Sequence, residues 1–170
     1  MRKGMTIPEP RLEYRKAQPY VAIRGGVAMK EIGIVLPSLN REVFLWLQNQ
    51  GMKPTGAPFW RYLLVDMAEK LEIDVALPVS ALLRGGERIV ADVLPAGTYV
   101  TTLYVGHPDG LTQATADLLS WAEVEGIEWR MKGPRWCGRI ERYLSDPSTE
   151  PNMRKWKTEL AFLTDDGREG

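Results

Sequence analysis

The same succession of structural signals occurs twice along this chain, and that repetition restricts the fold more than any single motif does. The first half, about residues 11–84, reads as strand-forming pieces, a helix and two further strands, and the second half, about residues 87–164, repeats this order. We therefore expect a mixed α/β (α+β) fold in which a β-α-β-β unit is duplicated about a pseudo-two-fold axis, with an antiparallel sheet and the helices on one side. Neither half is long enough to fold comfortably by itself, so one domain over residues 1–170 is predicted.

Two amphipathic helices are predicted from apolar residues at helical spacing. The first lies between Pro37, which suits a first helical turn, and Gly51. The second lies between Asp109, a plausible N-terminal cap, and Gly126. The apolar stripes are Leu39, Val43, Trp46 and Leu47 in the first helix, and Leu111, Thr115, Leu118 and Ala122 in the second. Each stripe is expected to pack on the sheet.

The strands of the two halves can be aligned with each other. Tyr20 corresponds to Tyr99 once a short insertion is allowed near Pro95, and Glu159 in the last strand corresponds to Asp74. The matching positions of the two tyrosines suit a structural use at least as well as a role in binding.

The stretch 136–163 reads as two strands joined by a proline-bearing turn. Because side chains alternate between the two faces of a strand, Glu141 shares a face with Cys137, Arg139 and Tyr143. Glu159 lies within the second strand, and charged residues are uncommon inside apolar strands unless they face water or serve a function. Glu141 and Glu159 are therefore the candidate functional carboxylates. The alternative is that Glu141 pairs with an arginine on a solvated face, an arrangement worth about 0–1 kcal/mol.

Aromatic residues near these carboxylates have two possible uses. In the strand after the first helix, Trp60 and Tyr62 share a face and are candidates to line a cleft between the halves. Aromatic residues in strands belong to the core more often than to a ligand site. Tyr143 carries more weight because it shares a face with Glu141, whereas Trp136 lies on the opposite face and is expected in the core.

Composition excludes several classes of protein. Lys and Arg together number 22, as do Asp and Glu, so no excess charge indicates binding to nucleic acid or an anionic membrane. The single cysteine, Cys137, excludes an intrachain disulfide and a cysteine-rich metal site, and no catalytic partner for it is evident. No apolar signal segment follows the charged N-terminus, and no stretch is long enough to cross a membrane. We expect a cytoplasmic protein without a metal or other cofactor.

Three segments resemble the GyrI-like small-molecule-binding family: GAPFWRYLLVD, LEIDVALPV and GRIERYLSDPSTEPNMRKWKTELAFL. That family includes the effector-binding domains of multidrug-responsive regulators such as BmrR and Rob, together with stand-alone proteins. The resemblance extends from about Arg11 to Leu163 and implies a duplicated α/β fold with a central groove. Because no residues remain at either end for a helix-turn-helix segment, we expect a stand-alone module that does not itself bind DNA. The sequence specifies neither the natural ligand nor a partner regulator.

The resemblance also implies roles for particular residues. In the drug-binding members, a glutamate at the position of Glu141 pairs with the positive charge of a cationic ligand, and a second glutamate corresponds to Glu159. Aromatic side chains of a Pro-Phe-x-x-Tyr segment sandwich the ligand, and this segment is represented here by Phe59 and Tyr62. The predicted ligand-binding residues are Glu141, Glu159, Tyr143, Tyr62, Trp60 and Phe59.

Two functions remain open at this point. We favour binding of aromatic, often cationic, small molecules between the halves. The alternative is a hydrolase, because some stand-alone relatives resemble enzymes that open the strained ring of cyclopropane-bearing alkylating compounds. Glu141 and Glu159 would then be catalytic, one activating water and the other, kept neutral by apolar surroundings, donating a proton. Inhibition of DNA gyrase through protein contact is a third possibility that no motif supports.

Overall fold

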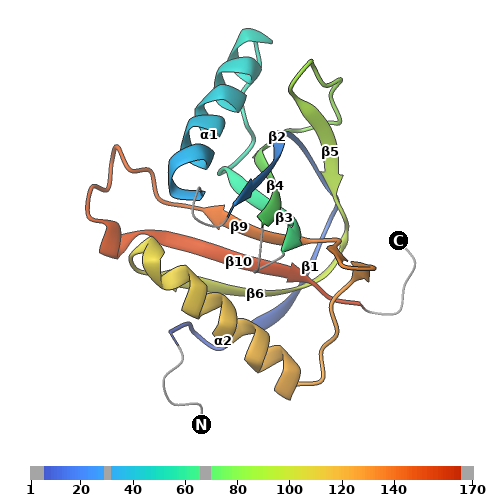
Figure 1. Ribbon diagram of the computed structural model, residues 1–170, viewed down its shortest axis with the longest axis vertical. Helices are drawn as coiled ribbons and strands as arrows, with labels where there is room; N and C mark the ends of the chain where they lie inside the picture. The colour runs from blue at the N-terminus through green and yellow to red at the C-terminus, as the bar shows by residue number, and fades with distance from the viewer. Residues whose placement is uncertain (1–5, 29–31, 66–69, 166–170) are drawn as a thin grey trace.

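A computed structural model describes residues 6–28, 32–65 and 70–165 (Figure 1). The elements of the first half are β1 (Arg11–Arg15), β2 (Gln18–Ala28), α1 (Ile32–Asn49), β3 (Phe59–Val65) and β4 (Lys70–Pro78). Those of the second half are β5 (Val90–Leu94), β6 (Gly97–Val105), the 3-10 helix η2 (Pro108–Gly110), α2 (Leu111–Val124), β7 (Met131–Lys132), β8 (Arg135–Trp136), β9 (Arg139–Tyr143), the 3-10 helix η3 (Met153–Lys155) and β10 (Lys157–Leu163).

The strands form one antiparallel sheet whose order reflects the duplication. The order is β1-β6-β10-β9-β3-β4-β2-β5, with the short β7–β8 hairpin attached to β3. Each strand of the first half has its counterpart at the mirror position, so a pseudo-two-fold axis passes between β3 and β9. The predicted α/β (α+β) fold with a duplicated β-α-β-β unit is confirmed. The first strand of each half pairs with the other half, β1 with β6 and β5 with β2, which the sequence did not predict.

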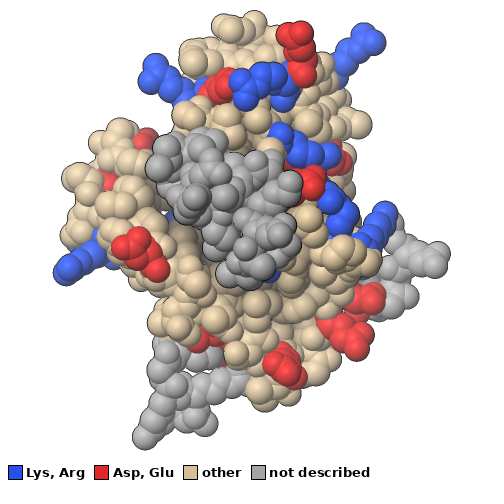
Figure 2. All heavy atoms as spheres, viewed as in Figure 1, with Lys and Arg blue, Asp and Glu red and all other residues tan. Residues whose placement is uncertain are grey.

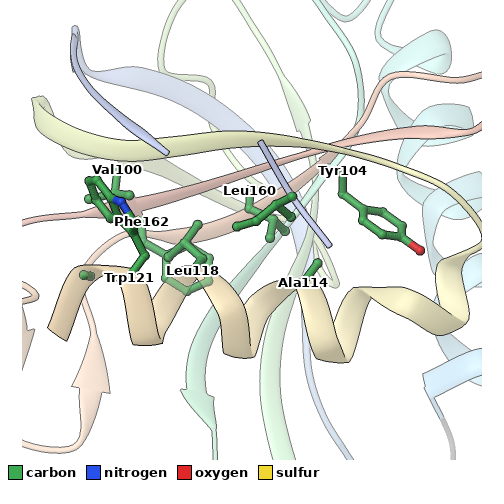
Figure 3. Close-up of a cluster of buried hydrophobic side chains, with 9 residues drawn as sticks. Val100, Tyr104, Ala114, Leu118, Trp121, Leu160 and Phe162 are labelled. Atoms are coloured by element: carbon green, nitrogen blue, oxygen red, sulfur yellow. The ribbon is translucent and has the colours of Figure 1, made fainter. Parts of the chain in front are cut away.

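Both helices pack on the same face of the sheet. Val43 and Leu47 of α1 form a buried cluster with Val21 of β2 and Leu77 of β4. At the other end of the sheet, α2 packs against β6 and β10 through a cluster whose labelled members are Val100, Tyr104, Ala114, Leu118, Trp121, Leu160 and Phe162 (Figure 3). The central strands β3 and β9 therefore lie between the two helix-covered regions (Figure 1).

The opposite face of the curled sheet encloses a second core. Tyr20, Phe59, Tyr99, Ile140 and Leu163 are buried there. The two tyrosines occupy equivalent positions, since Tyr20 lies opposite Pro78 in β4 and Tyr99 lies opposite Leu163 in β10. The same register makes Asp74 and Glu159 equivalent, as the alignment of the halves predicted.

A charged network extends from Asp74 and Arg61, which are buried in this second core, to the more exposed Arg24 and Asp92. Tyr20 donates a hydrogen bond of 2.5 Å to Asp74, and Arg24 donates two of 2.7 and 2.9 Å to the same carboxylate. Arg61 donates to the Tyr20 hydroxyl at 2.8 Å and lies 3.8 Å from Asp92. Burial raises the pKa of Tyr20, and the Asp74 charge raises it further. Because the buried Asp74 and Arg61 lie beside the opposite charges of Arg24 and Asp92, the cost of burying them is offset.

The helix ends agree only partly with the sequence predictions. Gly51 and Gly126 adopt φ values of +72° and +74°, the left-handed conformation expected just beyond a helix C-terminus. The first helix begins at Ile32 rather than near Pro37, so the single backbone hydrogen bond that a proline removes is tolerated. Asp109 does not cap the second helix, because it lies within η2 and the N-cap residue of α2 is Gly110; His107 caps η2 by accepting from the Asp109 backbone N–H at 3.0 Å.

The buried face of α2 is rotated slightly from the predicted one. Ala114, Leu118, Trp121 and Ala122 are the buried residues of this helix. Thr115, which the sequence placed on the buried stripe, is only half-buried, and Trp121 lies on the buried face.

The surface shown in Figure 2 has basic and acidic side chains interspersed, with no broad area of one sign. None of the helices within the described ranges has the length and apolar character needed to cross a membrane.

Candidate functional site

The candidate site is built on the two central strands, where the halves meet. Trp60 of β3 lies directly opposite Glu141 of β9. Since cross-strand neighbours point to the same side of a sheet, and side chains alternate along each strand, Tyr62 and Tyr143 share this face. This is the helix-bearing face, because Trp60 and Tyr62 pack against the buried cluster that includes Ile73, and α1 contacts the same cluster.

The Glu141 carboxylate is held by two tyrosine hydroxyls. Tyr143 donates to Glu141 Oε1 at 2.6 Å, and Tyr62 donates to the same oxygen at 3.0 Å. Burial raises the pKa of Glu141, although both hydroxyls and the charge of Arg139 act in the opposite direction. Among the described residues, none donates a hydrogen bond to the other oxygen, Oε2.

Aromatic side chains surround this carboxylate. The Trp60 and Tyr143 rings meet edge to face, with centroids 5.0 Å apart and an interplanar angle of 73°. Trp60 Nε1 donates to Asn40 Oδ1 of α1 at 3.1 Å, which fixes the indole between the strand and the helix. Burial raises the pKa values of Tyr62 and Tyr143 well above the usual range, and the Glu141 charge raises them further. Both phenols therefore remain protonated donors.

Arg139 completes the group on this face. Its guanidinium carbon lies 4.7 Å from the centre of the Trp136 ring, 4.9 Å from that of Phe162 and 5.6 Å from that of Tyr62. Burial lowers the pKa of Arg139, while the nearby Tyr62 and Glu141 oppose this effect. Arg139 is therefore held by ring faces and lies within the electrostatic range of Glu141.

The structure does not bring Glu159 and Phe59 to this group. Glu159 lies opposite Arg142 on the reverse face of the sheet, where Arg15 donates to it at 2.8 and 2.9 Å and Arg142 at 3.3 Å. Burial opposes ionisation of Glu159, but these arginines outweigh burial and its pKa is lowered. Phe59 is fully buried on the reverse face and packs edge to face on Tyr20, with centroids 5.3 Å apart.

Two further positions differ from the sequence analysis because the chain turns near Gly138. One continuous strand was expected from residue 136, but β8 ends at Trp136 and β9 begins at Arg139. Trp136 consequently packs with the helix-side cluster, the side of Glu141, and Cys137 packs with the core of the reverse face. The expected faces of these two residues were therefore interchanged.

A local repeat in the sequence that was not used above marks the site. Residues 60–63 read Trp-Arg-Tyr-Leu, and residues 141–144 read Glu-Arg-Tyr-Leu. The register places these segments at equivalent positions about the pseudo-two-fold axis. The two tyrosines that converge on Glu141 are therefore symmetry counterparts, and Trp60 occupies the position equivalent to Glu141.

A cavity of about 530 Å³ lies at one edge of the Glu141 group. Its lining residues include Arg61, Pro95, Cys137 and Trp136, the ring on which Arg139 stacks, but not Glu141. In the described ranges, no three His, Cys, Asp or Glu side chains are close enough together to hold a metal ion.

Comparisons with known proteins identify the family. The model of the GyrI-like small molecule binding domain matches residues 8–163. The chain belongs to this family. The match spans both halves of the sheet, so the GyrI-like domain includes the Glu141 group and the reverse face alike. A search of curated proteins found no match.

Several solved structures share the GyrI-like fold. The EcmrR C-terminal domain aligns with a TM-score of 0.77 and 21% identity, covering 95% of this chain and 99% of that one. The chain spans 57% of the EcmrR chain in a complex with DNA. SAV2435 bound to tetraphenylphosphonium aligns with a TM-score of 0.66 and 14% identity, covering 94% of this chain and 95% of that one. A hydrolase from Listeria innocua aligns with a TM-score of 0.64 and 14% identity, covering 92% of each chain.

Proposed function

We propose that this GyrI-like domain binds aromatic small molecules on the helix-bearing face of the sheet, with Glu141 directed at a positively charged or hydrogen-bond-donating group. The observation that carries the proposal is the state of the Glu141 carboxylate. It is half-buried among aromatic rings, and its Oε1 accepts both tyrosine hydroxyls. Its Oε2 accepts no hydrogen bond from a described residue, and we assign this oxygen to the ligand.

Elementary electrostatics supports a cationic group at this position. A carboxylate withdrawn from water loses several kcal/mol of solvation, on the order of what a paired charge can restore. A bound cation would supply this compensation, and each well-placed aromatic face would add about 0.5–2 kcal/mol. The Trp60 and Tyr143 rings beside Glu141 provide such surfaces. The relative SAV2435, which is bound to the aromatic cation tetraphenylphosphonium, is consistent with this chemistry.

The geometry gives less support to hydrolysis by paired glutamates. That mechanism requires two carboxylates at one substrate, one activating water and the other donating a proton. Glu141 and Glu159 lie on opposite faces of the sheet, and Glu159 is already engaged by Arg15 and Arg142. We therefore propose binding rather than two-carboxylate catalysis as the function.

Titration with a flat aromatic cation such as ethidium tests the proposal through quenching of tryptophan fluorescence. Glu141→Gln should weaken binding about tenfold to a hundredfold, because a hydrogen bond to a charged group is worth about 1.5–3 kcal/mol. Glu159→Gln is a matched control, since it removes the same charge from the adjacent strand on the other face. Undiminished binding by Glu141→Gln, with its folding verified by thermal melting, would exclude Glu141 from the site.

A further inference from the structure

Arg139 presents its charge to the same face as Glu141 but does not neutralise it directly. The two residues are separated by one position on β9, so their side chains point the same way. No ion pair or hydrogen bond joins them in the part of the chain that the structure describes. Arg139 instead stacks on Trp136, with Tyr62 and Phe162 also close to its guanidinium.

Tyr62 connects the two charged groups. Its hydroxyl donates to Glu141, while its ring lies beside the Arg139 guanidinium. A planar guanidinium on aromatic faces keeps its N–H donors at its edge, where they match the two oxygens of a carboxylate. Within the described residues, no side chain or carbonyl accepts a hydrogen bond from the Arg139 guanidinium.

Within the described ranges, none of the Arg139 nitrogen atoms is among the buried side-chain atoms that lack a hydrogen-bond partner, so these donors remain within reach of solvent and of a ligand. Arg139 is half-buried and remains charged, as arginine does in proteins. The site thus offers an open acceptor, Glu141 Oε2, and open donors on Arg139, with aromatic walls around both. A ligand that is only a cation would satisfy Glu141 and be repelled by Arg139.

From this arrangement we infer that the ligand is amphoteric: an aromatic molecule that carries an anionic group, such as a carboxylate, in addition to its cationic or hydrogen-bond-donating group. Arg139 binds the anionic group, and Glu141 binds the other. This inference rests on the proposed function and narrows its ligand class. Arg139 then determines specificity between amphoteric aromatic molecules and simple aromatic cations.

Two dyes that differ only at the anionic group test the inference. One is a rhodamine with a free benzoate, and the other is its methyl ester, so the aromatic cation is the same in both. Fluorescence anisotropy titrations give their Kd values. The wild type should bind the free acid about tenfold or more tightly than the ester, since a hydrogen bond to a charged group is worth about that factor or more. Arg139→Gln should remove this preference by weakening the binding of the free acid.

The variants separate this inference from the proposed function. Glu141→Gln should weaken both dyes and preserve their ratio, because both share the cation. Arg139→Lys retains the charge but not the fork of donors, so it should keep part of the preference. Arg154→Gln, a control at an exposed residue, removes one positive charge elsewhere and should change neither Kd. Thermal melting of each variant verifies its folding.

Each outcome has a distinct meaning. If both dyes bind the wild type equally well, or if the preference survives Arg139→Gln, the role of Arg139 is overturned while the proposed function stands. If neither dye binds the wild type, both are overturned. A preference that disappears in Arg139→Gln and survives in Glu141→Gln supports the inference.

Discussion

Tyr143→Phe removes one of the two hydroxyls that hold Glu141 and keeps the ring that packs on Trp60. The hydroxyl lies 2.6 Å from Glu141 Oε1, compared with 3.0 Å for Tyr62. A hydrogen bond to a charged group contributes about 1.5–3 kcal/mol, and because water reaches this half-buried site we expect a loss of about 2 kcal/mol. For a chain of this size the loss corresponds to a decrease in Tm of about 4–8 °C. The longer bond of Tyr62 predicts a smaller loss for Tyr62→Phe.

Urea denaturation followed by circular dichroism, at a mildly alkaline pH that keeps Glu141 ionised, measures this free energy of unfolding. Tyr14→Phe is the matched control, because Tyr14 is 63% exposed and should change the free energy by less than about 0.5 kcal/mol. A double-mutant cycle with Glu141→Gln isolates the contribution of the charge. In the glutamine background, Tyr143→Phe should cost only about 1 kcal/mol, the value of a neutral hydrogen bond.

An equal cost of Tyr143→Phe in both backgrounds would refute this reasoning, because the hydroxyl would then not be bonded to an ionised carboxylate. A cost no larger than that of Tyr14→Phe would refute it equally, since the bond would contribute nothing to the folded state.

Three further predictions concern stability. Burial raises the pKa of Glu141, so the wild type should lose stability relative to Glu141→Gln as pH rises through and above the usual glutamate range. Arginine contacts lower the pKa of Glu159, so the stability that Glu159 contributes should be present above that range and disappear as pH falls. Urea denaturation at a series of pH values measures both effects. Asp74→Ala should lower the free energy of unfolding by about 3–5 kcal/mol, measured by urea denaturation, because it breaks the ion pair of this fully buried carboxylate with Arg24 and leaves the buried Tyr20 hydroxyl without its acceptor. Gly126→Ala should cost about 1–2 kcal/mol by calorimetry, since a Cβ at φ +74° meets no neighbour and only the backbone is strained.

Much of the fold could be predicted because its signals are local. Helical spacing, glycines beyond the helices and the repeated order of elements gave the α+β class and the pseudo-two-fold duplication. The exchange of β1 and β5 between the halves could not be predicted, because strand pairing between distant segments leaves no local signal. The equivalence of Glu159 and Asp74 could be predicted, since both lie in strands with similar flanking residues.

The candidate site shows how far the alternation of side chains between the two faces of a strand can predict which residues lie together. Within β9, alternation placed Glu141, Tyr143 and Arg139 on one face, as the structure does. Alternation cannot relate Glu141 to Glu159 across the long connection between β9 and β10, because a shift of one residue exchanges the faces. The bend at Gly138 similarly reversed the expected faces of the two residues before it. The repeated Arg-Tyr-Leu at residues 61–63 and 142–144 was the available signal for the register of β3 against β9.

A crystal structure of the protein with the free-benzoate rhodamine bound tests most directly whether Glu141 is the centre of the binding site. The account predicts the dye on the helix-bearing face, with its rings against Trp60 and Tyr143 and its cationic end within hydrogen-bond distance of Glu141 Oε2. A dye bound elsewhere, for example in the cavity lined by Arg61 and Cys137, with no contact to Glu141, would contradict it.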